Sequence, residues 1–151
     1  MSSKTSRRAV LLAAPALILA GCQARPPRGP VMPADEAADP ARPLTLIYLG
    51  ARNCPYCIEW EGEPEQAFLA SADRRSITYR RLIFASFRNL TSDRVWPEDL
   101  VWVRDELGIT GGTPQYIIVR GRRVLLATIG TDTWSSEVLP TLRARLQAEQ
   151  G

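Results

Sequence analysis

The sequence predicts an α/β fold in which helices cover both faces of a sheet. From Leu44 onward, short apolar segments of strand length alternate with longer segments whose apolar residues recur at helical spacing. Glycines and prolines separate several of these segments, as expected where a chain turns. The resulting order of strand, helix, strand, helix, strand, strand and helix is typical of a sheet that is covered on both sides.

Local patterns set the bounds of each element. In chain order we expect a strand over 44–49, a helix from just after Cys54 to about Ala72, a strand over 77–84, a helix over 98–107, strands over 115–119 and 124–129, and a helix over about 135–150. The first strand is a nearly continuous apolar run that suits burial on both faces and should stop at Gly50. The first helix should be kinked near Gly62 and Pro64, because proline removes a backbone hydrogen bond. Residues 86–97 show no period and are predicted as a surface loop.

The C-terminal half has clear start and stop signals. The second helix carries an apolar stripe of Leu100, Val103 and Leu107, and Gly108 should end it. Gly121 lies in the turn that joins the third and fourth strands into a hairpin. The residues expected to face the core from the last helix are Val138, Leu139, Leu142 and Leu146.

The first 21 residues read as a signal peptide. Lys4, Arg7 and Arg8 precede an apolar run over 9–20. As a helix this run rises only about 18 Å, well short of a hydrocarbon core of about 30 Å, so a permanent membrane span is not expected. The twin arginines resemble a twin-arginine export signal, and a general export signal is an equal alternative.

Leu19-Ala20-Gly21-Cys22 resembles a bacterial lipobox. The resemblance implies that Cys22 is lipidated and anchors the chain to a bilayer, on the periplasmic side of a bacterial membrane. The alternative is an ordinary cleaved signal peptide. Gln23 after the cysteine mildly favours the outer membrane.

Residues 22–43 are rich in proline and nearly free of large apolar side chains, so they are expected to form an extended tether. The folded domain is then predicted over 44–151.

Cys54 and Cys57 lie between the first strand and the first helix. A helix N-terminus offers unpaired N–H groups and a partial positive charge, which favour a thiolate. Cys54 is therefore predicted to be the exposed thiol that attacks a substrate disulfide, and Cys57, one turn deeper, to attack the mixed disulfide. Pro55 suits the first helical position, where a backbone N–H has no helical partner.

Three other interpretations of this cysteine pair stay open. A zinc site needs about four ligands, but the sequence has no histidine, and its third cysteine is Cys22. A purely structural disulfide across so short a loop removes little entropy from the unfolded chain. Two inert thiols fit poorly with an exported protein, because that compartment is oxidising.

From about Leu44 to its end, the chain resembles the thioredoxin superfamily. The Cys-Pro-Tyr-Cys tetrapeptide at 54–57 is typical of glutaredoxins and occurs in exported thioredoxin-like proteins, and 107–114 resembles the segment that carries the family's cis-proline. The resemblance implies a thioredoxin-like fold with a central mixed sheet and a cis bond before Pro114. The residues that it implies in substrate binding are Pro55, Tyr56, Thr113 and Pro114. Exported thioredoxins of sulfur-oxidation systems look most similar.

The sequence departs from that family at specific positions. Tyr48 stands where thioredoxins have a buried acid that assists proton transfer, and Gly50 stands where they have tryptophan. Gly112 is an extra residue before the proline. Glu59 and Glu61 are expected to be solvated charges on a helix face, and the alternative is that one of them helps to move a proton. A further hypothesis places Trp96 in a peptide-binding groove.

The function implied by the resemblance is thiol–disulfide exchange with exported protein partners. An upstream membrane redox partner is expected to exchange electrons with the cysteine pair, and no metal or organic cofactor is implied. A copper-delivery protein is one alternative, although past Cys22 the chain offers only Met32 as a further soft ligand. A noncatalytic docking domain is another. Nucleic acid is excluded as a partner, because without Lys4, Arg7 and Arg8 the basic and acidic residues are equal in number.

Overall fold

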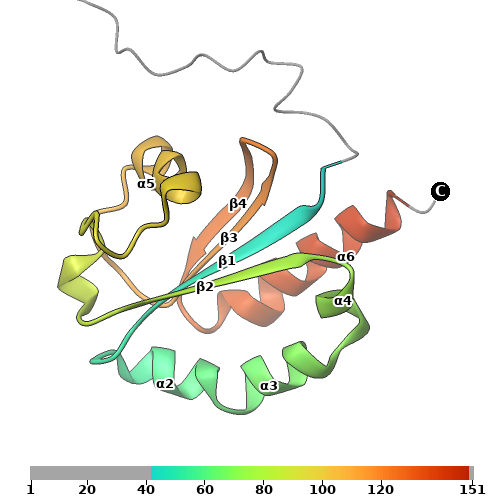
Figure 1. The fold of residues 1–151 in the computed structure, drawn as a ribbon. Helices are drawn as coiled ribbons and strands as arrows, with labels where there is room; N and C mark the ends of the chain where they lie inside the picture. Colours follow the sequence, from blue (N-terminus) through green and yellow to red (C-terminus); the bar gives the residue numbers. More distant parts are fainter. Residues whose placement is uncertain (1–41, 150–151) are drawn as a thin grey trace, which may run out of the picture. The chain divides into compact units, whose positions relative to one another are not determined.

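The computed structural model describes residues 42–149. The predicted signal peptide, Cys22 and nearly all of the predicted tether lie outside the described residues. The elements, in chain order, are β1 (Leu44–Ala51), α2 (Pro55–Glu61), α3 (Glu63–Ala70), α4 (Ala72–Arg75), β2 (Thr78–Phe84), the 3-10 turns η1 (Phe87–Asn89) and η2 (Glu98–Leu100), α5 (Val101–Leu107), β3 (Gln115–Arg120), β4 (Arg123–Ile129), the π-helical turn η3 (Trp134–Val138) and α6 (Leu139–Gln147) (Figure 1). Within 42–149, every helix is too short or too polar to cross a membrane.

The sheet is mixed and has the strand order β2-β1-β3-β4. β1 runs parallel to β2 and antiparallel to β3, and β3 pairs with β4 as an antiparallel hairpin. Figure 1 shows α5 on one side of this sheet and α2, α3 and α6 on the other. The predicted fold class, a thioredoxin-like mixed sheet with helices on both faces, is confirmed.

Two hydrophobic clusters fill the space between the sheet and its helices. β1 supplies both, because its side chains alternate between the two faces. Ile47, Leu49 and Ala51 pack with the α5 side, and this cluster includes both cysteines. Leu46 and Tyr48 point to the opposite face, where the cluster includes aromatic residues of α2, α3 and η3. The disulfide motif is therefore joined to the core through the end of β1.

Two predicted boundaries were wrong. β1 does not stop at Gly50 but continues to Ala51, because both residues pair with β2. The predicted kinked helix is three separate helices, with breaks at Gly62 and Ser71. At the second break the Ser71 hydroxyl accepts the Arg74 N–H at 3.2 Å and so caps α4.

Residues 86–97 are not simply a surface loop. Leu90 is fully buried and Trp96 is nearly so. The indole N–H of Trp96 donates to the Leu90 carbonyl at 2.6 Å, and its ring lies 6.0 Å from that of Phe84. Trp96 is therefore a core residue that shapes this loop, and the hypothesis that it lines a peptide groove is wrong.

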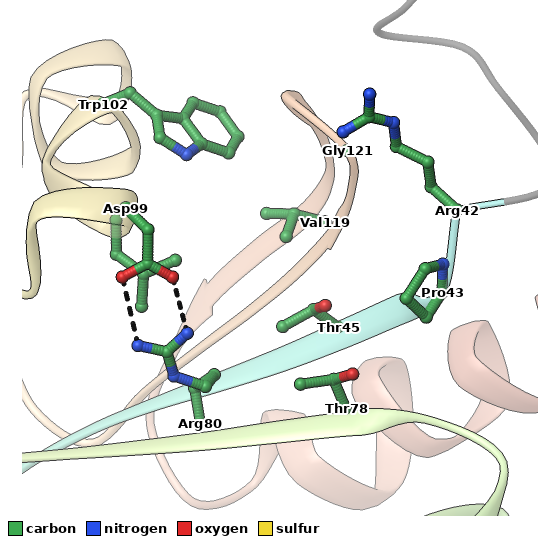
Figure 2. A pocket seen from close by; sticks show the side chains of 10 residues that line it. Arg42, Pro43, Thr45, Thr78, Arg80, Asp99, Trp102, Val119 and Gly121 are labelled. Atoms are coloured by element: carbon green, nitrogen blue, oxygen red, sulfur yellow. Dashed lines mark hydrogen bonds and ion pairs between the residues drawn. The ribbon is translucent and has the colours of Figure 1, made fainter.

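One pocket lies at the start of β1, around Pro43 and Thr45 (Figure 2). Arg80 on its wall donates to the Asp99 carboxylate at 2.6 and 3.2 Å. The cysteine motif follows the other end of β1. This pocket is thus separated from the cysteines by the length of the strand.

Candidate active site

Cys54 and Cys57 form a disulfide at the start of α2, with their Cα atoms 5.2 Å apart. Cys54 is the N-cap residue, with extended backbone angles, and Pro55 is the first helical residue, as its missing N–H allows. The Cys57 N–H points at the Cys54 sulfur, 3.1 Å away. In the reduced pair the same N–H would stabilise a thiolate on Cys54.

The two cysteines differ little in exposure in the disulfide form. Cys57 is fully buried, and Cys54 is only 4 % exposed, so the prediction of an exposed Cys54 does not hold for this form. Its sulfur is covered because it lies 3.4 Å from the carbonyl oxygen of Thr113. Between the cysteines, Tyr56 is 62 % exposed and stands on the outer surface beside them.

The segment before β3 meets this sulfur. The Thr113–Pro114 bond is cis, as the sequence predicts. The extra residue Gly112 has φ 85°, and a Cβ there would lie 3.2 Å from the Ile129 side chain. Glycine is thus suited both to the left-handed conformation and to the close packing.

Gln115 fastens this segment, a role that sequence reasoning missed. Its side chain is buried, and its amide nitrogen donates to the carbonyls of Gly111 and Gly112 at 2.8 and 2.7 Å. The available signal was a polar residue at the start of an otherwise apolar strand. Because Thr113 follows directly, these bonds fix the carbonyl that contacts Cys54.

Asn53, a second residue that sequence reasoning missed, binds the loop after β2 to the cysteine motif. Its side chain donates to the Ser86 hydroxyl at 3.1 Å and accepts the Phe87 N–H at 3.1 Å. The residue directly before Cys54 is thereby tied to the loop after β2. Phe87 remains 38 % exposed, so this link sets an apolar side chain near the edge of the candidate site.

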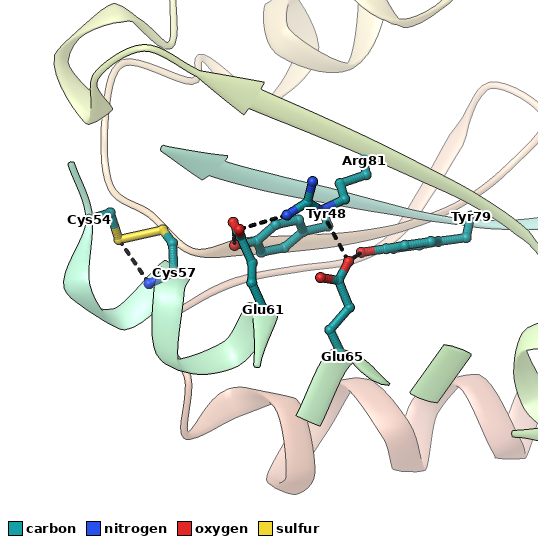
Figure 3. Close-up of polar contacts among 7 residues, drawn as sticks. All are labelled: Tyr48, Cys54, Cys57, Glu61, Glu65, Tyr79 and Arg81. Carbon is teal, nitrogen blue, oxygen red and sulfur yellow. Dashed lines mark hydrogen bonds and ion pairs between the residues drawn. A yellow bond between two sulfur atoms is a disulfide. The ribbon is translucent and has the colours of Figure 1, made fainter. Parts of the chain in front are cut away.

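A polar network connects α2 and α3 to the sheet (Figure 3). Glu61 accepts from the Tyr48 hydroxyl at 2.9 Å and from the Arg81 guanidinium at 2.6 Å. Glu65 pairs with the same guanidinium at 3.1 Å and accepts from the Tyr79 hydroxyl at 2.6 Å. One guanidinium thus joins two carboxylates, each of which also binds a tyrosine.

Gly50 provides the space for the first of these carboxylates. A Cβ at Gly50 would lie 2.8 Å from a Glu61 carboxylate oxygen and 2.6 Å from the Tyr48 hydroxyl. The prediction that Glu61 is a solvated charge was wrong, because its side chain is folded onto β1 and is only 24 % exposed. Although position 48 is a tyrosine, this face of the sheet therefore still carries an acidic group, the Glu61 carboxylate.

The tyrosines of this network stay protonated. Burial, followed by the hydrogen bond to Glu61, raises the pKa of Tyr48 well above its ordinary value. Burial and the bond to Glu65 do the same for the pKa of Tyr79. The pKa of Tyr116, opposite Tyr48 in the sheet, is raised mainly by burial.

Trp60 holds α2 against the sheet beneath the motif. Its ring centroid lies 4.3 Å from that of Tyr48 and 5.2 Å from those of Tyr116 and Trp134. Such pairs add about 0.5–1.5 kcal/mol each beyond the area that they bury. These contacts pack α2, which is capped by Cys54 and contains Cys57, against the sheet.

Within 42–149, no group of cysteine, histidine and acidic side chains is arranged to hold a metal ion.

The known proteins that this chain resembles are found among solved structures. No family model matches the chain, and no curated protein sequence matches it. Three similar solved structures are the reduced periplasmic thioredoxin SoxS of Paracoccus pantotrophus (19% identity, 72% of this chain and 99% of that chain, TM-score 0.47), spinach chloroplast thioredoxin f (14%, 74% and 82%, 0.46) and Malassezia sympodialis thioredoxin (11%, 69% and 76%, 0.48). The strand order and the disulfide at the start of α2 define a thioredoxin-like domain with a Cys-X-X-Cys site.

Proposed function

We propose that this chain is a thiol–disulfide oxidoreductase that exchanges disulfides with exported protein partners through Cys54 and Cys57. The observation that carries the proposal is the Cys54–Cys57 disulfide at the start of α2, with a backbone N–H directed at the Cys54 sulfur. A sulfur in that position is activated as a thiolate, which is the nucleophile in disulfide exchange.

The exchange proceeds in two displacements. The Cys54 thiolate attacks one sulfur of a substrate disulfide, forms a mixed disulfide, and releases the other substrate sulfur as a thiolate. The Cys57 thiolate then attacks the Cys54 sulfur and releases the second substrate sulfur. The substrate gains two electrons and the cysteine pair loses two. With an oxidised pair and a substrate dithiol, the same steps run in reverse.

The substrate segment would bind around the Cys54 sulfur. Thr113 supports this arrangement, because its carbonyl lies against that sulfur. Tyr56 supplies an exposed aromatic surface on one side of the pair. The residues proposed to contact the substrate are Pro55, Tyr56, Thr113 and Pro114.

We also propose that the domain works on the periplasmic side of a bacterial membrane, anchored by a lipid on Cys22 and fed by a membrane redox partner. The support is the lipobox-like sequence at 19–22 and the proline-rich stretch over 22–43. The similar protein SoxS is a periplasmic thioredoxin. Labelling of cells with a radioactive fatty acid should mark the wild-type chain and not Cys22→Ser.

Reduction of insulin and oxidative refolding of a reduced ribonuclease test the proposed chemistry. Cys54→Ser should abolish activity in both assays, because it removes the attacking sulfur. Cys22→Ser is the matched control, since it makes the same substitution at the third cysteine of the chain. Full activity of Cys54→Ser in both assays would refute the proposal.

A further inference from the structure

The second displacement requires a buried thiol to lose its proton. Cys57 is fully buried, so water has no direct access to it. Its thiol must nevertheless lose a proton to attack the Cys54 sulfur, because the thiolate is the nucleophile. A nearby group has to take that proton. The identity of this group deepens the proposed function and rests on it.

Glu61 is placed to receive the proton. It lies four residues after Cys57 within α2, and such residues lie on one face of a helix with Cβ atoms about 5–6 Å apart. Trp60, which completes this stripe, faces the sheet and is buried. Figure 3 shows the Glu61 side chain on the same part of α2 as the disulfide, directed toward Tyr48 on the sheet.

Two contacts hold the Glu61 carboxylate in that place. One oxygen accepts from the Tyr48 hydroxyl and the other from Arg81. Gly50 beneath the carboxylate has no side chain to displace it. The side chain is also 24 % exposed, so a proton taken from the protein interior can pass on to water.

The other charged and titratable groups around Glu61 favour this assignment. Arg81 on β2 balances the negative charge, and Tyr48 and Tyr79 are neutral hydrogen-bond donors. On β3, Tyr116 is neutral as well. On α3, Glu65 competes for the same guanidinium but is 4 % exposed and bound to Tyr79. On α2 itself, Glu59 is exposed, and its negative charge contributes to the raised pKa of Tyr116.

We propose that Glu61 is the proton acceptor for Cys57, and that Tyr48 and Arg81 are its positioning residues. In the mixed disulfide, the Cys57 thiol gives its proton to the Glu61 carboxylate, directly or through water. The resulting thiolate bonds to the Cys54 sulfur. The bond from Cys54 to the substrate sulfur breaks, and its electron pair leaves with the substrate. Glu61 then releases the proton to solvent. In the reverse direction Glu61 returns a proton to Cys57.

The reaction of the reduced full-length chain with Ellman's reagent separates the two displacements. Attack by Cys54 releases a first coloured thiolate, and attack by Cys57 on the mixed disulfide releases a second. Glu61→Gln keeps the size and hydrogen-bonding capacity of the side chain but cannot accept the proton as a carboxylate does. It should slow the second phase by about tenfold or more near neutral pH, and change the first by less than about twofold.

The pH profile distinguishes a proton acceptor from a merely structural residue. The second phase of Glu61→Gln should rise continuously with hydroxide concentration and approach the wild-type rate in alkali. Glu65→Gln is the matched control, because it removes the other carboxylate from Arg81. It should change the second phase by less than about threefold. Gly50→Ala should slow the second phase while keeping the carboxylate, since the added methyl group displaces Glu61 and Tyr48.

The outcomes separate this inference from the proposed function. A wild-type chain with no second phase, or one with the same phases as Cys57→Ser, would contradict the proposed dithiol chemistry itself. Two normal wild-type phases, together with a Glu61→Gln second phase equal to that of Glu65→Gln at every pH, would overturn the role of Glu61 alone. If Glu61→Gln does not fold, Gly50→Ala provides the test. A second phase in Gly50→Ala that is as fast as in the wild type would overturn the assignment of Glu61 as proton acceptor.

Discussion

The sulfur of Cys54 lies 3.4 Å from the carbonyl oxygen of Thr113, a residue that is 59 positions later in the chain. The candidate site is thus assembled from two distant segments, the start of α2 and the turn before β3. Asn53 and Gln115 fasten loops next to those segments. Each of these contacts has a consequence that can be measured.

Cys57→Ser should trap the substrate. Cys54 can still attack a disulfide in this variant, but no second sulfur is present to release the product. Mixed disulfides should therefore accumulate and be visible on a non-reducing gel and by mass spectrometry. Cys54→Ser should trap none. Equal trapping by both variants would mean that the two cysteines have interchangeable roles.

Gln115→Leu should impair both stability and exchange. It leaves the carbonyls of Gly111 and Gly112 without their side-chain donor, which costs about 1–3 kcal/mol for a buried group. Exchange should slow because Thr113 is held less firmly. Gln66→Leu, at an exposed glutamine, is the control. Urea unfolding and insulin reduction measure the two effects, and equal unfolding midpoints for both variants would contradict the prediction.

Asn53→Ala should loosen the loop that follows β2. The Phe87 N–H then loses its acceptor and the Ser86 hydroxyl loses a donor. Hydrogen exchange at the Phe87 amide should become faster, and global stability should fall by only about 1 kcal/mol, because the contacts are exposed. Asn89→Ala, in the same loop, is the control. A Phe87 amide that stays as protected as in the wild type would count against this link.

The free energy of unfolding should decline in alkali because of the buried Tyr48 and Tyr116 and the half-buried Tyr79. The pKa of Tyr48, Tyr79 and Tyr116 is raised in the fold, whereas unfolded tyrosine ionises near pH 10. Above about pH 10 the unfolded state therefore binds fewer protons than the native state, and the free energy of unfolding falls as pH rises. Below about pH 10 this contribution is fully present.

Tyr79→Phe tests that account directly. Removing this half-buried phenol should flatten the alkaline slope of the free energy of unfolding by up to about 1.4 kcal/mol per pH unit. Denaturant titrations at a series of alkaline pH values give this slope. Tyr56→Phe, at an exposed tyrosine, controls for the loss of a hydroxyl. An unchanged slope in Tyr79→Phe would show that this residue does not cause the decline.

Much of the fold was predictable because its elements carry local signals. The apolar run of β1, the periodic stripe before Gly108 and the hairpin at Gly121 each depend on neighbours in the sequence. The cysteine pair and the cis-proline segment are short motifs that resemble a known family. These features identify the candidate site without knowledge of tertiary contacts.

The rest depended on contacts between distant residues. β1 extends past Gly50 because β2 pairs with it there, and no local pattern reports that pairing. Trp96 is in the core because its indole reaches Leu90. The direction of the Glu61 side chain depends on Tyr48, on Arg81 and on empty space above a glycine. A helical charge pattern carries none of that information, which is why Glu61 was expected in solvent.

Gly50 restricts how this sequence can diverge. Any side chain there would occupy the volume that now holds the Tyr48 hydroxyl and the Glu61 carboxylate. A larger residue at position 50 would therefore displace these two groups unless positions 48 and 61 also change. The residues at positions 48, 50 and 61 are therefore expected to vary together, because a bulky residue at position 50 would displace the Glu61 carboxylate from its present place.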